Sequence, residues 1–293
     1  MSGPLLLLVT LALGQADAGY VRTRTPDGLH CLHWPVAAGA RTTITFVQSD
    51  AGYSPLGPGF LDAVSSSAAT WRAQMQSCGN LDLVEGPRSA SRLVGYEEHG
   101  NNENLVLVRI RDCAFVVPAT DPCHASASCG NAYDCWDHGP DILALTTVTA
   151  GANDGVVVDA DTEVNAVSKF PTLVDSPPCA AGVPSLSCVA NDVQSFDTHE
   201  FGHFLGLAHA PDPTSTMYYQ VPYGDVSRRT LDPGSRQFVC DVYPAGRASN
   251  DCSAADTGGS GSGCNASGPP GGLASSLFAL ALLSLALRRS SGP

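Results

Sequence analysis

The chain is nearly devoid of lysine. Lys169 is the single example in 293 residues, and Lys and Arg together number 15 against 28 Asp and Glu, for a formal net charge of −13. Nucleic acids and anionic lipids attract proteins through clustered positive charge. The composition therefore argues against both as partners. The acidity is compatible with calcium sites, because carboxylate oxygens are the ligands that Ca²⁺ prefers.

The sequence also lacks internal repeats, and the apolar run at its start is short. Residues 5–13 form an apolar stretch that is too short to span a membrane. Ala16-Asp17-Ala18 then provides a small-x-small cleavage site before Gly19. We therefore predict that Met1–Ala18 is a secretory signal peptide and that the chain is exported.

The C-terminal end carries a second predicted targeting signal. A flexible linker, residues 246–271, contains Cys264 and leads to a hydrophobic tail, residues 272–293, with an apolar run at 273–287 and two arginines after it. Such a tail resembles the surface-sorting tails of myxobacterial exported proteins, which are processed near the cysteine. A membrane-anchoring helix is the alternative, although the run is marginal for crossing a hydrocarbon core of about 30 Å. Both interpretations place the protein outside a bacterial cell, on its surface or released from it.

Paired C-x-x-C motifs are absent, so a Cys-rich zinc site around residues 113–135 is a poor alternative for that stretch. Eleven cysteines in an exported chain favour disulfides instead. With Cys264 assigned to the linker, ten remain and allow five bridges, whose pairing the sequence does not assign. Cys179–Cys188 is the best local pair, because it closes a loop just before residue 191. The ten are Cys31, Cys78, Cys113, Cys123, Cys129, Cys135, Cys179, Cys188, Cys240 and Cys252.

One short run, residues 199–209, indicates a metal site. On a helix, residues four apart lie about 40° apart around the axis, so His199 and His203 place two imidazoles side by side, as a tetrahedral zinc ion requires. Glu200 lies one step around the helix, within reach of a metal-bound water. Gly206 allows the helix to stop and the chain to deliver His209 as a third ligand. Three histidines leave the fourth position open, which is typical of a catalytic zinc site.

The same run resembles the zinc-binding motif of the metzincin metalloproteases. It reads H-E-x-x-H-x-x-G-x-x-H, and Met217 follows after a short polar, proline-rich loop, as in the metzincin methionine turn beneath the zinc. An amphipathic core helix with incidental histidines is the alternative. It is a poor one, because three converging histidines have no use in a hydrophobic core.

Within the metzincins the chain most resembles the matrixins, the matrix metalloprotease family. The resemblance covers roughly residues 41–245 and is strongest at 156–243. Residues 191–195 are similar to the matrixin approach to the zinc helix, and 231–243 to its closing C-terminal helix. Residues 158–165 resemble the antiparallel edge strand that lines the matrixin substrate cleft. The resemblance implies one catalytic domain, residues 19–245, that hydrolyses peptide bonds with a single catalytic zinc ion.

Three positions depart from the matrixin pattern. Ala210 follows the third histidine, where matrixins usually have serine and astacins glutamate. The turn reads Met-Tyr-Tyr at 217–219 rather than Met-Tyr-Pro, a spacing similar to that of astacins and serralysins, which makes Tyr219 a candidate oxyanion stabiliser; a packed or surface tyrosine is the alternative. Asp161 stands where animal matrixins place a histidine for a second, structural zinc, so that zinc is not carried over.

Two regulatory features of the family receive different predictions. The first predicted strand begins some two dozen residues after the signal peptide, which leaves no room for a matrixin prodomain with its zinc-blocking cysteine. Cys31 could cap the zinc, but a disulfide is its expected fate.

Candidate calcium ligands are Asp154, Asp159, Asp161 and Glu163, for which solvated carboxylates are the alternative.

The apolar patterns predict an α+β fold. Its centre is a twisted, mostly parallel five-stranded sheet, combined with a long zinc-binding helix and a C-terminal helix. Irregular Cys-rich insertions are expected near 112–140 and 170–190. Strands are predicted at 41–48, 81–85, 104–110, 143–149 and 155–165, and helices at 60–76, from 191 or 192 to about 207, and at 231–243.

The resulting hypothesis is a zinc endopeptidase that acts as a monomer on proteins or peptides. The three histidines would hold zinc, and Glu200 would serve as the general base. The peptide would lie antiparallel to an edge strand near 156–164, and residues 218–230 would wall the pocket for the residue after the cut. Two alternatives remain: a surface binding or adhesive protein that keeps zinc without turnover, and an astacin- or serralysin-like protease that uses Tyr219.

Overall fold

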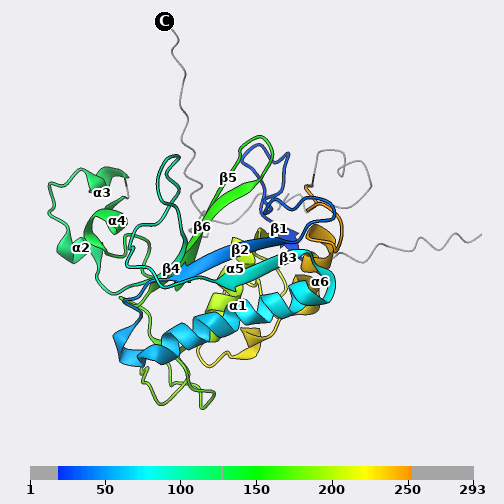
Figure 1. Ribbon diagram of the computed structural model, residues 1–293. Helices are drawn as coiled ribbons and strands as arrows, with labels where there is room; N and C mark the ends of the chain where they lie inside the picture. The colour runs from blue at the N-terminus through cyan, green and yellow to red at the C-terminus, as the bar shows by residue number, and fades with distance from the viewer. Residues whose placement is uncertain (1–18, 127, 253–293) are drawn as a thin grey trace, which may run out of the picture.

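A five-stranded sheet in the order β3-β2-β4-β6-β5 forms the centre of the protein (Figure 1). The computed structural model describes residues 19–126 and 128–252. Strands β3, β2, β4 and β6 run parallel to one another, whereas β5 is antiparallel to β6. The α+β class is confirmed, but the sheet is mixed rather than mostly parallel. The strands are β2 (Thr42–Gln48), β3 (Leu81–Glu85), β4 (Asn104–Arg109), β5 (Ala144–Ala150) and β6 (Val157–Asn165).

The antiparallel edge strand is β5, and not residues 158–165 as the matrixin resemblance implied. Those residues form β6, which lies between β4 and β5. Only residues 151–156 join β5 to β6, and such a short connection returns the chain in the opposite direction. Burial agrees with this order, because eight of the nine β6 residues are buried, whereas those of β5 are mostly half-buried.

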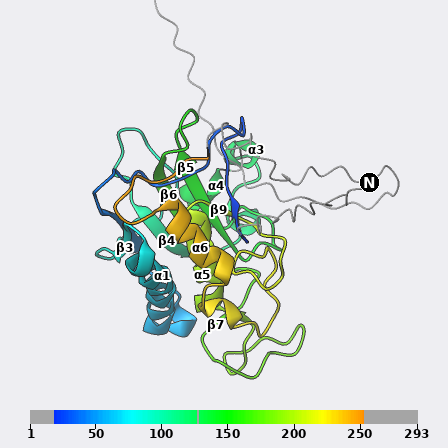
Figure 2. The same ribbon diagram turned by 90° about the vertical axis from the view of Figure 1, so that its right-hand side faces the viewer.

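Three helices cover one face of the sheet (Figures 1 and 2). They are α1 (Pro58–Cys78), α5 (Val193–Phe204) and α6 (Pro233–Val242). The fully buried Trp71 of α1 donates its indole N–H to the carbonyl of Thr198 at 2.8 Å and so joins α1 to α5. Full burial of a Phe or Met side chain contributes about 1.5–3 kcal/mol. The core between helices and sheet includes Phe46, Phe60, Met75, Phe196, Phe201, Phe204 and Phe238.

The zinc-motif helix α5 ends at Phe204, three residues before the predicted end. Gly206 has φ of +104°, the left-handed region that glycine enters without strain. The chain then forms strand β9 (Leu207–Ala208), which pairs antiparallel with β1 (Val21–Arg22) near the start of the described chain. The sequence predicted that Gly206 ends the helix, but it contained no sign that β1 would capture the residues that follow.

The remaining elements are short. A 3₁₀ turn, η1 (Ser54–Leu56), precedes α1, and a second one, η2 (Ser227–Arg229), precedes α6. Strands β7 (Pro171–Thr172) and β8 (Asn191–Asp192) pair in parallel and bring the start of α5 into position. The predicted strands and the helices α1 and α6 agree with the structure to within three residues at each end.

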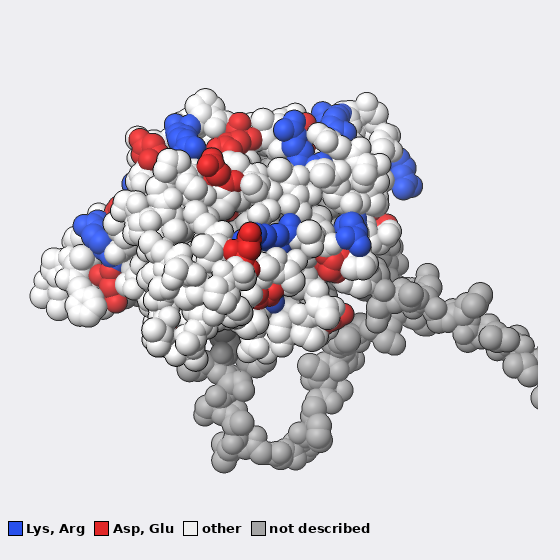
Figure 3. Space-filling view, turned by 90° about the horizontal axis from the view of Figure 1, so that it is seen from below, with Lys and Arg blue, Asp and Glu red and all other residues white. Residues whose placement is uncertain are grey.

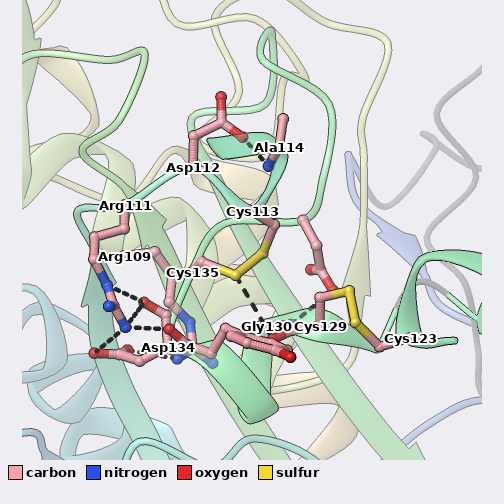
Figure 4. The surroundings of a disulfide bond; sticks show 12 residues. Arg109, Arg111, Asp112, Cys113, Ala114, Cys123, Cys129, Gly130, Asp134 and Cys135 are labelled. Carbon is pink, nitrogen blue, oxygen red and sulfur yellow. Dashed lines mark hydrogen bonds and ion pairs between the residues drawn. A yellow bond between two sulfur atoms is a disulfide. The ribbon is translucent and has the colours of Figure 1, made fainter. Parts of the chain in front are cut away.

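The Cys-rich insertion is a small lobe beside the sheet, made of α2 (Cys113–Val116), α3 (Cys123–Ser126) and α4 (Cys129–Tyr133) (Figures 1 and 4). Disulfides Cys113–Cys135 and Cys123–Cys129 close it. Its last helix is followed by the C-cap residue Asp134, whose carboxylate accepts a 2.8 Å hydrogen bond from the fully buried Arg109 of β4. This ion pair anchors the lobe to the sheet.

All ten of the cysteines expected to form disulfides are paired. Cys179–Cys188, the predicted local bridge, is confirmed. The four cysteines between 113 and 135 are joined in two disulfides, which agrees with the predicted bridges and not with the alternative of a Cys-rich zinc site. The two remaining bridges are Cys31–Cys252, which spans 221 residues, and Cys78–Cys240, which joins α1 to α6. By loop-closure entropy, the longest bridge contributes about 5 kcal/mol through the unfolded state.

Within the part of the chain that the structure describes, no helix has the length and apolar character needed to cross a membrane. The predicted signal peptide and hydrophobic tail, and most of the predicted linker, lie outside the described residues. Viewed from below (Figure 3), Lys and Arg side chains are scattered over the face together with Asp and Glu, so both signs of charge are mixed there.

Candidate metal centre

His199, His203 and His209 come together at the end of α5. One ring nitrogen from each histidine lies within 4.8 Å of the ring nitrogens of the other two. The Nε2 atoms of His203 and His209 are 3.2 Å apart. The ring centroids are separated by 4.7–5.2 Å. Among the described residues, this is the one group of three or more His, Cys, Asp or Glu side chains whose ligand atoms converge in this way.

Hydrogen bonds to backbone carbonyls set the tautomers of the two helical histidines. His199 Nδ1 lies 2.7 Å from the carbonyl oxygen of Thr216, and His203 Nδ1 lies 2.8 Å from that of Leu207. A carbonyl oxygen can only accept, so each Nδ1 carries the proton and donates it. Each Nε2 therefore presents its lone pair to the centre of the triad. This arrangement is typical of histidines that ligate a metal.

The environment keeps all three imidazoles neutral. Burial lowers the pKa of His199 well below its ordinary value, and the neighbouring His203 lowers it further. Burial also lowers the pKa of His203, and it lowers that of His209 to about 4. Neutral imidazoles are the form that binds metal. The donor set, tautomers and spacing thus fit Zn²⁺, with three nitrogen ligands and one open position.

Glu200 is buried next to the triad and is held by the edge strand. Its Oε2 accepts a 2.7 Å hydrogen bond from the Thr146 hydroxyl of β5. The Thr146 oxygen is also 2.9 Å from the hydroxyl of Thr162 on β6. Burial raises the pKa of Glu200 to about 7, and the contacts with Thr146 oppose this rise. A carboxyl group with such a pKa can take up and release protons near neutral pH.

Met217 lies directly under α5. A side chain added at Gly202 would place its Cβ 2.2 Å from the Met217 sulfur, so the thioether occupies the space above the glycine α-carbon. Met217 is 1% exposed, and its carbonyl accepts a 2.9 Å hydrogen bond from the N–H of Ala210. The methionine therefore packs against α5 at the residue before His203, and its role as the floor of the zinc site stays a prediction.

Tyr219 stands at the open side of the triad. Its ring centroid is 6.3 Å from that of His209 and 4.7 Å from that of Tyr218, and the side chain is 59% exposed. The structure therefore places Tyr219 beside the third histidine, on the solvent side. Its exposure also fits the alternative of a surface tyrosine, and a role in stabilising the oxyanion stays a prediction.

The four acidic residues suggested as calcium ligands do not form one site. The Asp161 carboxylate accepts hydrogen bonds from the N–H groups of Gly95 and Leu105. Glu163 pairs with Arg109 at 2.6 Å, and Asp154 accepts from the N–H of its own turn, at residue 156. The carboxylates that were expected to bind calcium thus serve the sheet and its loops, and the structure does not support the calcium prediction. The fourth is Asp159, which lies beside Asp161.

Asp192, one of the two residues at which the sequence predicted the zinc-motif helix to begin, is held in place by Arg229, which the sequence did not reveal. Asp192 caps α5 by accepting from the N–H of Ser195 at 2.9 Å. Arg229 then donates to both oxygens of Asp192, at 2.8 and 2.6 Å. This two-pronged ion pair ties the helix to η2, 37 residues away. Thr146, likewise, comes from a distant strand, and no local pattern could have identified either residue.

Residues 129–243 match the family model of the matrixins, Peptidase M10. The matched range contains the histidine triad, Glu200 and Met217, together with β5 and β6. The match supports a matrixin-type metzincin domain in this part of the chain, and hence a zinc metalloprotease in general. No curated protein matches the chain.

Proposed function

We propose that residues 19–245 form an exported zinc endopeptidase in which His199, His203 and His209 hold the metal. The observation that carries the proposal is the convergence of the three imidazoles beside a buried carboxyl group on the same helix. Zinc, when bound, supplies Lewis-acid chemistry that activates water and polarises the scissile carbonyl. The protein is proposed to act as a monomer, as the sequence suggested.

Glu200 is proposed as the general base and acid. Its carboxylate takes a proton from the attacking water and delivers it to the nitrogen of the departing amine. The Thr146 hydroxyl holds Oε2 of Glu200, so the carboxylate keeps one orientation through both transfers. Tyr219 is a candidate donor to the oxygen that gains negative charge, as in the astacin-like alternative, because its ring lies beside His209 on the solvent side.

The substrate is proposed to bind along β5 rather than along β6. Strand β5 is the sheet's edge on the side of α5, and its Thr146 contacts Glu200. An edge strand offers unpaired N–H and C=O groups to an extended peptide. Residues 218–230 would line the pocket beyond the cut. This substrate position replaces the one near 156–164, which the interior place of β6 rules out.

The site of action follows from the two ends of the chain. The signal peptide would export the protein, and the C-terminal tail would attach it to the cell envelope until it is released. We propose this localisation from the sequence patterns at residues 1–18 and 272–293. Protease protection of the tail in intact cells, compared with its sensitivity after lysis, would test it.

The decisive experiment compares the full chain with its Glu200→Ala variant. Zinc content is measured by metal analysis, and turnover is measured on a quenched generic peptide with and without a chelator. The expected result is one zinc per chain in both proteins, with turnover in the variant lower by a factor of about 10²–10⁴. Zinc without cleavage in the unaltered protein would instead favour a non-catalytic binding protein. Full turnover in Glu200→Ala would refute the assigned base.

A companion experiment tests Tyr219. The Tyr219→Phe variant removes only the hydroxyl, and Tyr96→Phe is the matched control, because Tyr96 is also exposed and lies outside residues 218–230. If Tyr219 stabilises the oxyanion, its variant loses kcat at unchanged zinc content while the control does not. Equal activity of the two variants would exclude the astacin-like role.

A further inference from the structure

Four successive backbone carbonyls at the end of α5 accept hydrogen bonds from outside the helix. The last carbonyls of a helix have no hydrogen-bond donor within the helix. The donors that bind them from outside therefore fix the direction in which the chain leaves the helix. The donors are Thr23, Trp34 and Tyr243, two of which belong to the N-terminal segment, residues 20–34. The bonds are Trp34 Nε1 to Phe204 at 2.9 Å, Tyr243 hydroxyl to Leu205 at 2.7 Å, Thr23 N–H to Gly206 at 2.9 Å and Thr23 hydroxyl to Leu207 at 2.9 Å.

The last of these carbonyls also serves the metal centre. The oxygen of Leu207 accepts from the Thr23 hydroxyl at 2.9 Å and from His203 Nδ1 at 2.8 Å. A carbonyl oxygen has two lone pairs and can accept both bonds. Thr23, Leu207 and His203 therefore form a continuous chain of hydrogen bonds that ends at a predicted zinc ligand. Any tilt of the Leu207 peptide would turn the imidazole with it.

The contact between the N-terminal segment and this turn is closely fitted. Arg22 is the register partner of Leu207 in the β1–β9 pair. The N–H of Leu32 donates to the Thr23 carbonyl at 2.9 Å, which fixes Thr23 from its other side. The Leu32 carbonyl lies so close to Gly206 that a Cβ there would be 2.4 Å from its oxygen. The turn that delivers His209 is thus built against the N-terminal segment.

His199 provides an internal comparison. His199 Nδ1 donates to the carbonyl of Thr216. The N–H of Thr216 in turn donates at 3.0 Å to Asp232, which lies just before α6. Both helical histidines thus donate to a carbonyl that a distant element holds in place. For His199 that element lies inside the matched range 129–243, whereas for His203 it is Thr23, which lies more than a hundred residues before it.

We propose that Thr23 is a positioning residue for His203, and that the N-terminal segment is part of the metal centre. The inference rests on the proposed function only in that it needs the triad to bind zinc. The partners of ligating histidines change metal affinity by about 10- to 100-fold when they are removed. Thr23 acts one bond further out, so its hydroxyl is expected to contribute a factor of about 3–10.

The test uses the full chain with Thr23→Val, which removes the hydroxyl and keeps the branched shape. Thr25→Val is the matched control, because the Thr25 hydroxyl binds Asp27 and His30 within its own turn and does not reach Leu207. Zinc dissociation constants are measured by competition with a chromogenic chelator. The visible spectrum of the Co²⁺ derivative reports ligand geometry, and thermal melting of the metal-free proteins reports general loosening.

The expected result is zinc binding weaker by about 3–10-fold and altered Co²⁺ bands in Thr23→Val, neither of which occurs in Thr25→Val, with recovery in Thr23→Ser. Equal zinc affinity of the Thr23→Val variant and the unaltered protein would overturn the inference while leaving the proposed function intact. So would a loss that Thr25→Val shares, because it would report loosening of the whole segment. An unaltered protein that binds no zinc would overturn the proposed function, and the inference with it.

Discussion

Thr146 gives the sharpest test of how the sheet controls the chemistry of Glu200. In Thr146→Val the side chain keeps its shape and loses the hydroxyl that donates to Glu200 Oε2 at 2.7 Å. A hydrogen bond to a charged group contributes about 1.5–3 kcal/mol, and 1.36 kcal/mol corresponds to one pKa unit. Because the bond favours the charged carboxylate, its loss raises the pKa of Glu200 above its present value of about 7.

The assay is the pH dependence of kcat/KM on a quenched peptide. We expect the acid limb to move to higher pH by about 1–2 units and the activity at pH 7 to fall by about 5- to 50-fold. Thr147→Val is the control, because it changes the neighbouring residue of the same strand without touching Glu200. An unchanged acid limb in Thr146→Val, with zinc content preserved, would refute the argument that this hydroxyl sets the proton affinity of the base.

Three further outcomes follow from the described contacts. Gly202→Ala should lower the free energy of unfolding by about 1–3 kcal/mol, seen as a lower melting temperature, because its Cβ would meet the buried sulfur of Met217 at 2.2 Å; an unchanged melting temperature would show that the methionine moves freely. The pKa of His30 is raised, chiefly by its hydrogen bond to Asp251. Burial raises the pKa of Asp251, but the hydrogen bonds from His30 and Cys31 and the nearby histidine charge together outweigh burial and leave this pKa lowered. The stability that His30 contributes is lost as the pH rises through its pKa in the folded protein. The stability that Asp251 contributes is lost as the pH falls through its pKa in the folded protein. His30→Ala should therefore make the free energy of unfolding depend less on pH above about pH 6.5, where free histidine titrates. Chelation should abolish peptide cleavage and lower the melting temperature, and restored zinc should recover both; cleavage that persists without metal would contradict the proposed function.

Local patterns predicted the parts of the site that are close together in the sequence. His199, His203 and His209 lie within eleven residues, so helical geometry and one glycine suffice to bring them together. Met217 follows directly and could be placed by the same reasoning. Glu200 is adjacent to the first histidine, so its position beside the triad could be predicted, whereas its role as the general base stays a proposal. In each case a short chain segment fixes the geometry with no help from the rest of the fold.

The parts that sequence reasoning missed depend on contacts between distant segments. Residues 144–150 and 157–165 both read as strands, but only their pairing decides which one is the edge. The acidic residues of β6 suggested calcium sites, because the sequence does not show which residues of the neighbouring strands, such as Arg109, lie beside them. Thr146 and Thr23 are ordinary β-branched residues in short extended stretches, and their roles come from partners that are 54 and 184 residues away.

The bridge between Cys31 and Cys252 bears on when the protein becomes active. A ribosome makes residue 31 early and residue 252 some 221 residues later. Until both thiols have met in an oxidising compartment, no covalent bond retains the segment that supports His203. Assembly of a competent zinc centre is therefore tied to the completion of synthesis and to the redox state of the surroundings. Export into an oxidising compartment, as proposed from the signal peptide, would close this bridge, whereas a reducing cytoplasm would leave it open.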